Sequence, residues 1–223
     1  MRRVLIVDDH PIFAEAFAIA LAGAEPSCVV DIVTTVAAAE ARLRTARAYD
    51  YLFLDLLLPD ADGFSGLILC KNQRPALPIE IISARQDSHV ISIAHAFGAA
   101  GYLTKSLSLD AMTDQLRRVF SGEAVFPAAV TPVDDAEAGV RRRIERLSPA
   151  QFRVLRTLCS GALNKQIAET LELSEPTVKS HLAAIYKTLG VLNRSQAILA
   201  AHRLLQVKNA ERDPNAPDAD KDE

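Results

Sequence analysis

Four apolar runs in the first half of the chain each end in a polar residue that can do chemistry. Residues 4–7 are followed by Asp8 and Asp9, and residues 51–54 by Asp55. Residues 79–82 are followed by Ser83, and residues 102–104 by Lys105. Apart from Glu80 these runs carry no charge, which is typical of buried parallel strands. The carboxyl ends of such strands share one edge of the sheet, and ligands bind there. We therefore expect these polar side chains to converge on one pocket.

The first 121 residues alternate between strand and helix patterns. The predicted strands cover 3–7, 28–34, 50–54, 79–82 and 100–104, and the predicted helices cover 11–23, 36–47, 64–73, 87–97 and 108–121. Five successive strand–helix units indicate an α/β fold, a doubly wound five-stranded parallel sheet with helices on both faces.

The second half of the chain has only helical periodicity. Its predicted helices cover 149–160, 164–171, 175–189 and 193–206, an all-α unit. The segment before them contains Pro127, Pro132 and a run of charged residues, although 136–146 has the composition for a helix. We therefore expect a first domain over 1–121, a linker over 122–145, a helical domain over 146–207 and a disordered acidic tail over 208–223.

Charge is distributed unevenly over the 223 residues, whose formal net charge is -3. Residues 1–127 have 11 Lys+Arg against 15 Asp+Glu, whereas residues 144–208 have 9 against 4. A basic block beside an acidic one points to nucleic acid as a partner of the second unit alone. No apolar run approaches the roughly 18 residues of a membrane helix. With no signal-peptide pattern and three scattered cysteines, we expect a cytoplasmic protein without membrane contact.

The acidic pocket expected at the sheet edge has the composition of a metal and phosphoryl site. Three carboxylates repel each other unless a cation lies among them, so Asp8, Asp9 and Asp55 suggest Mg²⁺. Lys105 and Ser83 can bind phosphate oxygens, and Asp55 suits the role of nucleophile in forming an aspartyl phosphate. The simpler alternative is that the Asp8–Asp9 pair only caps the helix at 11–23. His10 is expected to be partly exposed and not a ligand.

The basic block contains a short helix, a tight turn and a second helix. Ser174 is placed to cap the second helix, and Pro176 is tolerated in its first turn. This order is that of a helix-turn-helix, in which the second helix enters the major groove of DNA. From periodicity alone, a generic helical bundle is the favoured alternative.

Several local motifs resemble known families. Val-Asp-Asp-His-Pro (7–11), Asp-Leu-Leu-Leu-Pro-Asp-Ala-Asp-Gly (55–63), Ser-Ala-Arg (83–85) and Gly-Ala-Ala-Gly-Tyr-Leu-Thr-Lys (98–105) resemble the receiver domains of bacterial response regulators. The resemblance implies that Asp55 is the phosphoacceptor. It also implies that Mg²⁺ is bound directly by Asp9 and Asp55, through water by Asp8, and by the Leu57 carbonyl. It implies further that Ser83 and Lys105 bind the acyl phosphate, and that Tyr102 is an aromatic switch residue that turns inward on phosphorylation. The family usually has proline after the lysine, where this chain has Ser106.

Leu147-Ser148-Pro149, Asn164 to Ala168, Ser174 to His181 and Leu189 to Arg194 resemble the LuxR-type DNA-binding domain. Together with the receiver they resemble response regulators of the NarL/LuxR type. The resemblance implies DNA contacts from Lys165, Thr177, Lys179, Ser180, His181, Ala183 and Lys187. It also implies dimerisation through the last helix, with Ala197, Ile198, Ala201 and Leu205. An Arg-Glu pair common in the family is replaced here by Ala150-Gln151.

The resulting hypothesis is a two-component response regulator that controls transcription. A sensor histidine kinase would phosphorylate Asp55, which would free the recognition helix from the receiver and allow the protein to bind DNA as a homodimer. The protein would not be an enzyme beyond slow self-dephosphorylation. One alternative is an aspartyl-phosphate phosphatase, but this class needs an acid/base aspartate where the chain has Leu57. The other alternative is a phosphorylation-independent DNA-binding regulator whose receiver is a protein-docking module.

Overall fold

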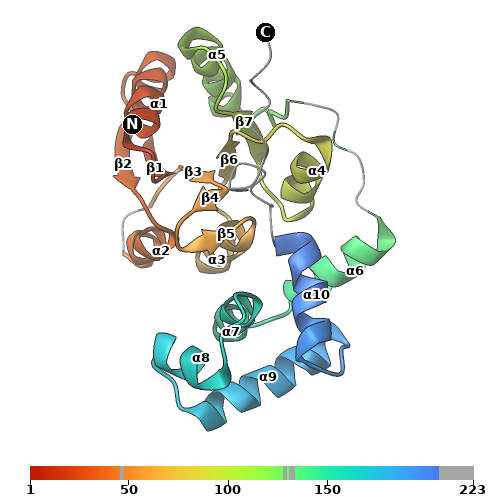
Figure 1. Cartoon of the computed structure of the whole chain (residues 1–223). Helices are drawn as coiled ribbons and strands as arrows, with labels where there is room; N and C mark the ends of the chain where they lie inside the picture. Colours follow the sequence, from red (N-terminus) through yellow and green to blue (C-terminus); the bar gives the residue numbers. More distant parts are fainter. Residues whose placement is uncertain (46–47, 128–129, 131–133, 206–223) are drawn as a thin grey trace, which may run out of the picture.

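The computed structural model describes residues 1–45, 48–127, 130 and 134–205, and it contains two units (Figure 1). The first is built on a five-stranded parallel sheet in the order β2-β1-β3-β6-β7. The strands are β1 (Arg3–Val7), β2 (Val29–Val33), β3 (Tyr51–Asp55), β6 (Ile79–Ser83) and β7 (Gly101–Thr104). The predicted α/β fold is confirmed, and each strand lies within one residue of its expected bounds.

Helices cover both faces of the sheet because successive side chains of a strand point to opposite faces. In β1, Val4 and Ile6 pack in a core with residues of α1 (Pro11–Ala24) and α5 (Leu109–Phe120). Leu5 and Val7 pack in the other core, with α2 (Val36–Arg44), α3 (Ser65–Gln73) and α4 (Ser88–Ala96). A short hairpin of β4 (Leu57–Leu58) and β5 (Ala61–Asp62) directly follows β3, and the sequence did not predict it.

The second unit is helical, with α6 (Asp135–Ile144), α7 (Pro149–Cys159), α8 (Asn164–Thr170), α9 (Glu175–Leu189) and α10 (Arg194–Leu205). As expected, Ser174 caps α9 by accepting a hydrogen bond from the Thr177 amide, and Gly190 ends it at φ 68°. Helix α6 lies in the segment expected to be a linker. It packs on the helical unit, because Ile144 is buried and the Arg143 guanidinium donates to the Leu189 carbonyl at 2.7 Å. The tail expected over 208–223 lies outside the described residues.

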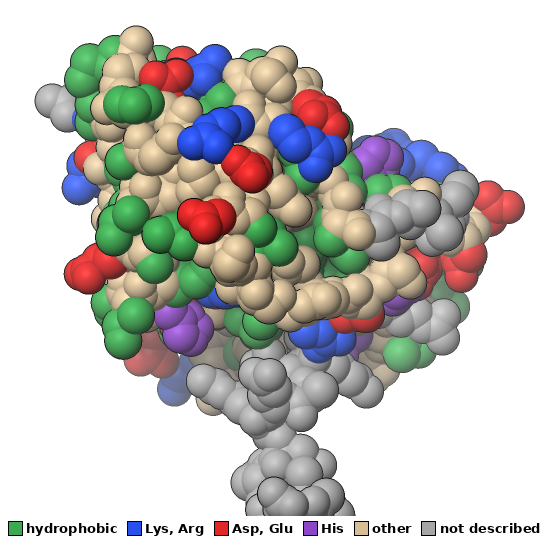
Figure 2. Space-filling view, turned by 90° about the horizontal axis from the view of Figure 1, so that it is seen from above, with side chains coloured by type: hydrophobic (Ala, Val, Ile, Leu, Met, Phe, Trp, Pro, Cys, Tyr) green, Lys and Arg blue, Asp and Glu red, His purple; other side chains and the backbone are tan. Residues whose placement is uncertain are grey.

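The surface seen from above carries interspersed acidic and basic side chains among apolar ones, and no single sign of charge dominates that face (Figure 2). Figure 2 therefore gives no sign of an extended basic patch on this side of the first unit.

Within the described residues, no helix combines the length and the hydrophobicity that crossing a membrane requires.

Glu80 is a buried carboxyl in the middle of the sheet. It is only 2% exposed, and its Oε2 atom has no hydrogen-bond partner. The carboxyl fits because its neighbour in β7 is Gly101, where an added Cβ would collide with Oε2. Burial raises the pKa of Glu80 to about 7 from its ordinary value of 4.5. Below that pH the folded protein holds Glu80 as a neutral acid.

We expect Glu80→Gln to remove a pH dependence of stability. The folded state holds the proton more tightly than the unfolded state, so the contribution of Glu80 is complete below pH 4.5 and is lost as pH rises through about 7. At pH 8 the Gln variant should therefore be more stable than wild type by ~2–3 kcal/mol. Urea unfolding at pH 5.5 and pH 8 measures this, with exposed Glu15→Gln as the control. Equal pH slopes in wild type and the Glu80 variant would contradict the assignment.

Candidate phosphoacceptor pocket and nucleic-acid interface

The polar residues at the strand ends meet, as the sequence predicted. The Lys105 ammonium lies 2.6 Å from Asp55 Oδ2 and 2.8 Å from Asp8 Oδ2, although these residues belong to three different strand ends. Ser83, at the end of β6, lies between β3 and β7 in the sheet and accepts a hydrogen bond from the Arg85 amide. The pocket thus contains an ammonium, a hydroxyl and several carboxylates at one edge.

Backbone contacts fix the lysine in this pocket. The Lys105 amide donates to the Ser83 carbonyl at 2.9 Å, which extends the pairing of β6 and β7 by one step. Its ammonium also lies 4.7 Å from the centre of the Phe13 ring, a cation–π contact that was not predicted from the sequence. No cis peptide bond occurs in the described residues, so the bond from Lys105 to Ser106 is trans. The Ser106 hydroxyl instead accepts a hydrogen bond from Gln86 at 2.8 Å.

The pocket has more negative charge than its lysine can balance. Asp8 and Asp55 are 0% and 3% exposed, and Asp9 lies beside them. Asp9 Oδ1 is buried without a hydrogen bond, and Asp8 Oδ2 is paired with the Lys105 ammonium. Burial raises the pKa of the Asp55 carboxyl, and the nearby Lys105 opposes that rise. Three carboxylates against one ammonium leave two charges uncompensated, and oxygen donors suit a hard divalent cation, so these residues fit a divalent metal site.

The flanking positions are also defined. The Leu57 amide donates to Asp55 Oδ1 at 3.2 Å, which places its backbone against the carboxylate, while its carbonyl remains only a predicted ligand. Tyr102 is fully buried, and its hydroxyl donates to the Arg85 carbonyl at 2.9 Å. Burial raises the Tyr102 pKa to about 12. Tyr102 is therefore turned inward in this structure, and its role as a switch residue stays a prediction.

In the described part of the chain, the hydrogen bonds and ion pairs named below join the two units through α6 and α7. Arg153 of α7 forms an ion pair at 2.6 Å with Glu40 of α2, which is only 7% exposed. One turn later, Arg156 donates to the Asp60 carbonyl at 3.1 Å. From α6, Arg141 donates to the Ala96 carbonyl at 2.9 Å. Figure 1 shows that α7 lies beside α3. Helix α9 lies on the side of the helical unit that faces away from the first unit (Figure 1).

The expected release of α9 on phosphorylation stays a prediction, and in this structure the outward side of α9 is already uncovered. Lys179, Ser180 and Ala183 on the outward side of α9 are exposed. The docking contacts instead use two arginines spaced three residues apart on α7. That spacing places both on one helix face, but their partners are remote in sequence and could not have been identified from it.

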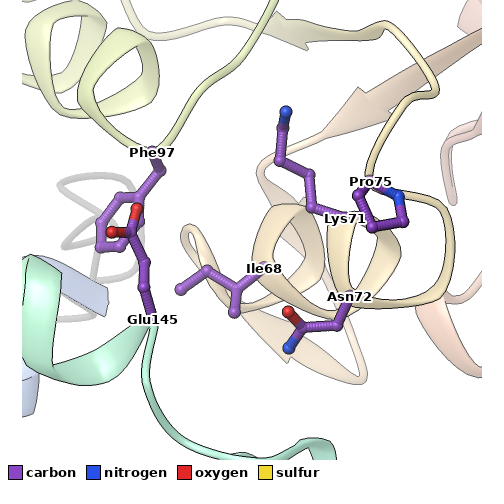
Figure 3. Close-up of a pocket in the computed structure, with 6 residues that line it drawn as sticks. All are labelled: Ile68, Lys71, Asn72, Pro75, Phe97 and Glu145. Carbon is purple, nitrogen blue, oxygen red and sulfur yellow. The ribbon is translucent and has the colours of Figure 1, made fainter.

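A cavity of about 230 Å³ remains between the units (Figure 3). Its walls are Ile68, Lys71, Asn72, Pro75 and Phe97 of the receiver together with Glu145, which follows α6. In Figure 3 Glu145 and Phe97 lie on one side of the space, and the α3 residues lie on the other. The contact between the units is therefore polar and incompletely packed.

We expect Arg153→Ala to open the contact between the units. The substitution removes the cation that pairs with the buried Glu40 carboxylate, and a buried charge without its partner disfavours the closed arrangement. Small-angle X-ray scattering should show a larger radius of gyration than wild type. Arg146→Ala, at an exposed arginine of the same region, serves as the control. An unchanged scattering profile for Arg153→Ala would mean that this ion pair does not hold the units together.

The residues predicted to contact DNA lie on α8 and α9. The exposed ones are Lys165, Lys179, Ser180, Ala183 and Lys187. Thr177 and His181 are half-buried. Lys179 and Ala183 also line a shallow groove with Asn164 and Arg194, two residues that the sequence analysis did not select. The role of each in DNA contact remains a prediction.

The predicted dimerisation residues of α10 do not share one surface. Ala197 and Ala201 are fully buried inside the helical unit, so in this conformation they cannot contact a second copy. The small side chains let α10 pack closely on α6, α7 and α9, which explains their burial. Ile198 is half-buried, and the Leu205 side chain lies outside the described part. Leu199, 59% exposed, marks the free side of the helix.

Two family models match the chain. The response regulator receiver domain matches residues 4–117, and the bacterial regulatory proteins of the luxR family match residues 145–201. The chain is 35% identical over 211 residues to a glycerol metabolism activator from Pseudomonas putida, covering 90% of this chain and 95% of that protein. It is 26% identical over 207 residues to the nitrate/nitrite response regulator NarL from Escherichia coli K12, covering 90% and 94%.

A similar solved structure is that of two RcsB dimers bound to two parallel DNAs. It is 24% identical with a TM-score of 0.50 and covers 89% of this chain and 97% of that one. At this identity the likeness concerns the fold. The family models, the curated relatives and the two-unit architecture agree with the motifs read from the sequence. The chain therefore belongs to the two-component response regulators of the NarL/LuxR type, in which a receiver domain precedes a LuxR-type DNA-binding domain.

Proposed function

We propose that Asp55 is the phosphoacceptor of this regulator and that Mg²⁺ is its metal. The observation that supports this most directly is the excess of carboxylate over cation at one sheet edge, with Lys105 already beside Asp55 at 2.6 Å. Asp8, Asp9, Asp55 and the carbonyl of Leu57 would hold the ion. The bound ion would neutralise charge on the incoming phosphoryl group.

In the proposed reaction, an oxygen of the Asp55 carboxylate attacks the phosphorus of a phosphohistidine on a sensor kinase. An O–P bond forms, and the N–P bond to the imidazole breaks with its electron pair going to the nitrogen. Lys105 would exchange its contact with Asp8 or Asp55 for a phosphoryl oxygen, and the Ser83 hydroxyl would donate to another. The product adds about -1.5 to -2 of charge at the site.

The proposed output is DNA binding by a homodimer. The exposed outer face of α9, with Lys179 at its centre, supports DNA as the partner. RcsB, which shares the fold, is a dimer on DNA in its solved complex. Asp60, five residues beyond the phosphoacceptor, offers a physical link to the helical unit: its carboxylate accepts from the Val36 and Ala37 amides of α2, and its carbonyl accepts from Arg156.

We infer that the protein does not turn over phosphoesters, because an aspartyl-phosphate phosphatase needs an acid/base carboxyl where this chain has Leu57. The remaining alternative, a receiver that only docks proteins, is tested with beryllofluoride, which mimics an acyl phosphate. Fluorine NMR should give a bound signal that requires Mg²⁺ together with fluoride and beryllium. If no bound signal forms at saturating Mg²⁺, the pocket is inert and the docking-module alternative is correct.

A further inference from the structure

We propose that His10 is an additional metal ligand, through its Nδ1 atom, and that it lets the acidic pocket bind a first-row transition metal such as Ni²⁺ more tightly than its oxygen ligands alone would. This inference rests on the proposed metal site and adds a nitrogen donor to it. The sequence analysis expected His10 to be partly exposed and not a ligand. Its side chain is indeed 64% exposed, but the imidazole is turned toward the carboxylates.

The position of the imidazole matches that of a ligand. Nδ1 lies 3.0 Å from Asp9 Oδ1, 3.3 Å from Asp8 Oδ1 and 3.9 Å from Asp55 Oδ2. Ligand atoms of the four residues all lie within 4.8 Å of one another. An octahedral ion with bonds of ~2.1 Å separates neighbouring ligand atoms by roughly 3 Å and opposite ones by roughly 4.2 Å. The three separations measured from Nδ1 lie within this range.

The backbone holds His10 in this position. Its amide donates to Asp8 Oδ1 at 2.9 Å, and its carbonyl accepts from the Ala14 amide at 3.0 Å. Pro11 begins α1 directly after it, which restricts the His10 backbone to its extended conformation. The imidazole therefore stands at the mouth of the pocket with only its side-chain torsions free.

Independent evidence for a cation here comes from the oxygens that face the imidazole. Asp8 is completely buried; its Oδ1 atom faces the imidazole, and its Oδ2 atom is paired with the Lys105 ammonium at 2.8 Å. Asp9 Oδ1, the atom closest to Nδ1, is buried without a hydrogen bond. A metal bound by Asp9 Oδ1 and Nδ1 would give this buried oxygen the partner that it lacks. Imidazole favours ions such as Ni²⁺, whereas an all-oxygen site favours Mg²⁺.

The test compares Ni²⁺ and Mg²⁺ binding by calorimetry in the full-length protein and in His10→Ala. We expect His10→Ala to weaken Ni²⁺ binding by about tenfold or more and to change Mg²⁺ binding by less than about twofold. X-ray absorption of bound Ni²⁺ should show imidazole scattering in wild type and lose it in the variant. The matched control is His89→Ala, because the His89 side chain is 61% exposed but lies at the start of α4.

The outcomes separate this inference from the proposed function. Imidazole scattering that is absent in wild type, or that persists in His10→Ala, would overturn the ligand assignment. Mg²⁺-dependent beryllofluoride binding by the same variants reports on the phosphoacceptor site independently. If that binding is intact while Ni²⁺ shows no imidazole ligand, only the role of His10 is wrong. If wild type binds no beryllofluoride, the proposed phosphoacceptor function fails instead.

Discussion

Asp55→Asn should abolish phosphorylation by acetyl phosphate and, with it, any phosphorylation-dependent rise in DNA affinity. The substitution keeps the shape of the side chain but replaces the nucleophilic oxygen with a poorer nucleophile and removes one of the three negative charges that hold the metal. Intact-protein mass spectrometry after incubation with acetyl phosphate and Mg²⁺ measures the effect. Wild type should gain the mass of one phosphoryl group, and the variant should gain none.

The control for this experiment is Asp110→Asn, at an exposed aspartate in the first turn of α5. It changes the net charge by the same amount and lies outside the acidic pocket, so it should be phosphorylated like wild type. If Asp55→Asn still acquires a phosphoryl group, a different residue is the acceptor. If it fails to acquire one but binds DNA with an unchanged response to acetyl phosphate, the switch is independent of this pocket.

Lys179→Ala should weaken DNA binding by about 10- to 100-fold. Lys179 is exposed on the outward side of α9, where a helix in the major groove reaches base edges, and a lost base contact costs about 1–3 kcal/mol. Fluorescence anisotropy with a DNA site obtained from genome-wide occupancy mapping measures this, with a scrambled duplex as the non-specific reference. The loss should be much larger on the specific site than on the scrambled one.

Lys187→Ala provides the comparison within the same helix. Lys187 is exposed in the last turn of α9, and we predict that it contacts phosphates. Its loss should therefore weaken binding to both duplexes. It should also make the slope of the logarithm of the binding constant against the logarithm of the salt concentration shallower by about one. Equal losses on both duplexes for Lys179→Ala would assign Lys179 to the phosphate backbone as well. No loss for either variant would place the DNA interface elsewhere.

Much of the fold could be predicted because its signals are local. Runs such as Ile79–Ser83 and the cap at Ser174 contain their own strand or helix information in a few adjacent residues, and the structure reproduces them almost residue by residue. The hairpin formed by β4 and β5 was missed, because two-residue strands carry no periodicity. Helix α6 was only partly anticipated, since its composition suggested a linker and its packing on α9 and α10 decided otherwise.

The chain by itself determined the order of the elements and the convergence of Asp8, Asp55 and Lys105, since parallel strands bring their carboxyl ends to one edge whatever the rest of the fold does. Only the tertiary structure decided which surface of the helical unit meets the receiver. That choice depends on pairs such as Arg153 and Glu40, which are far apart in sequence and have no local signature. The burial of Ala197 and the inward turn of the His10 imidazole are likewise decided by packing and side-chain torsion, because neither is contained in the spacing of residues along the chain.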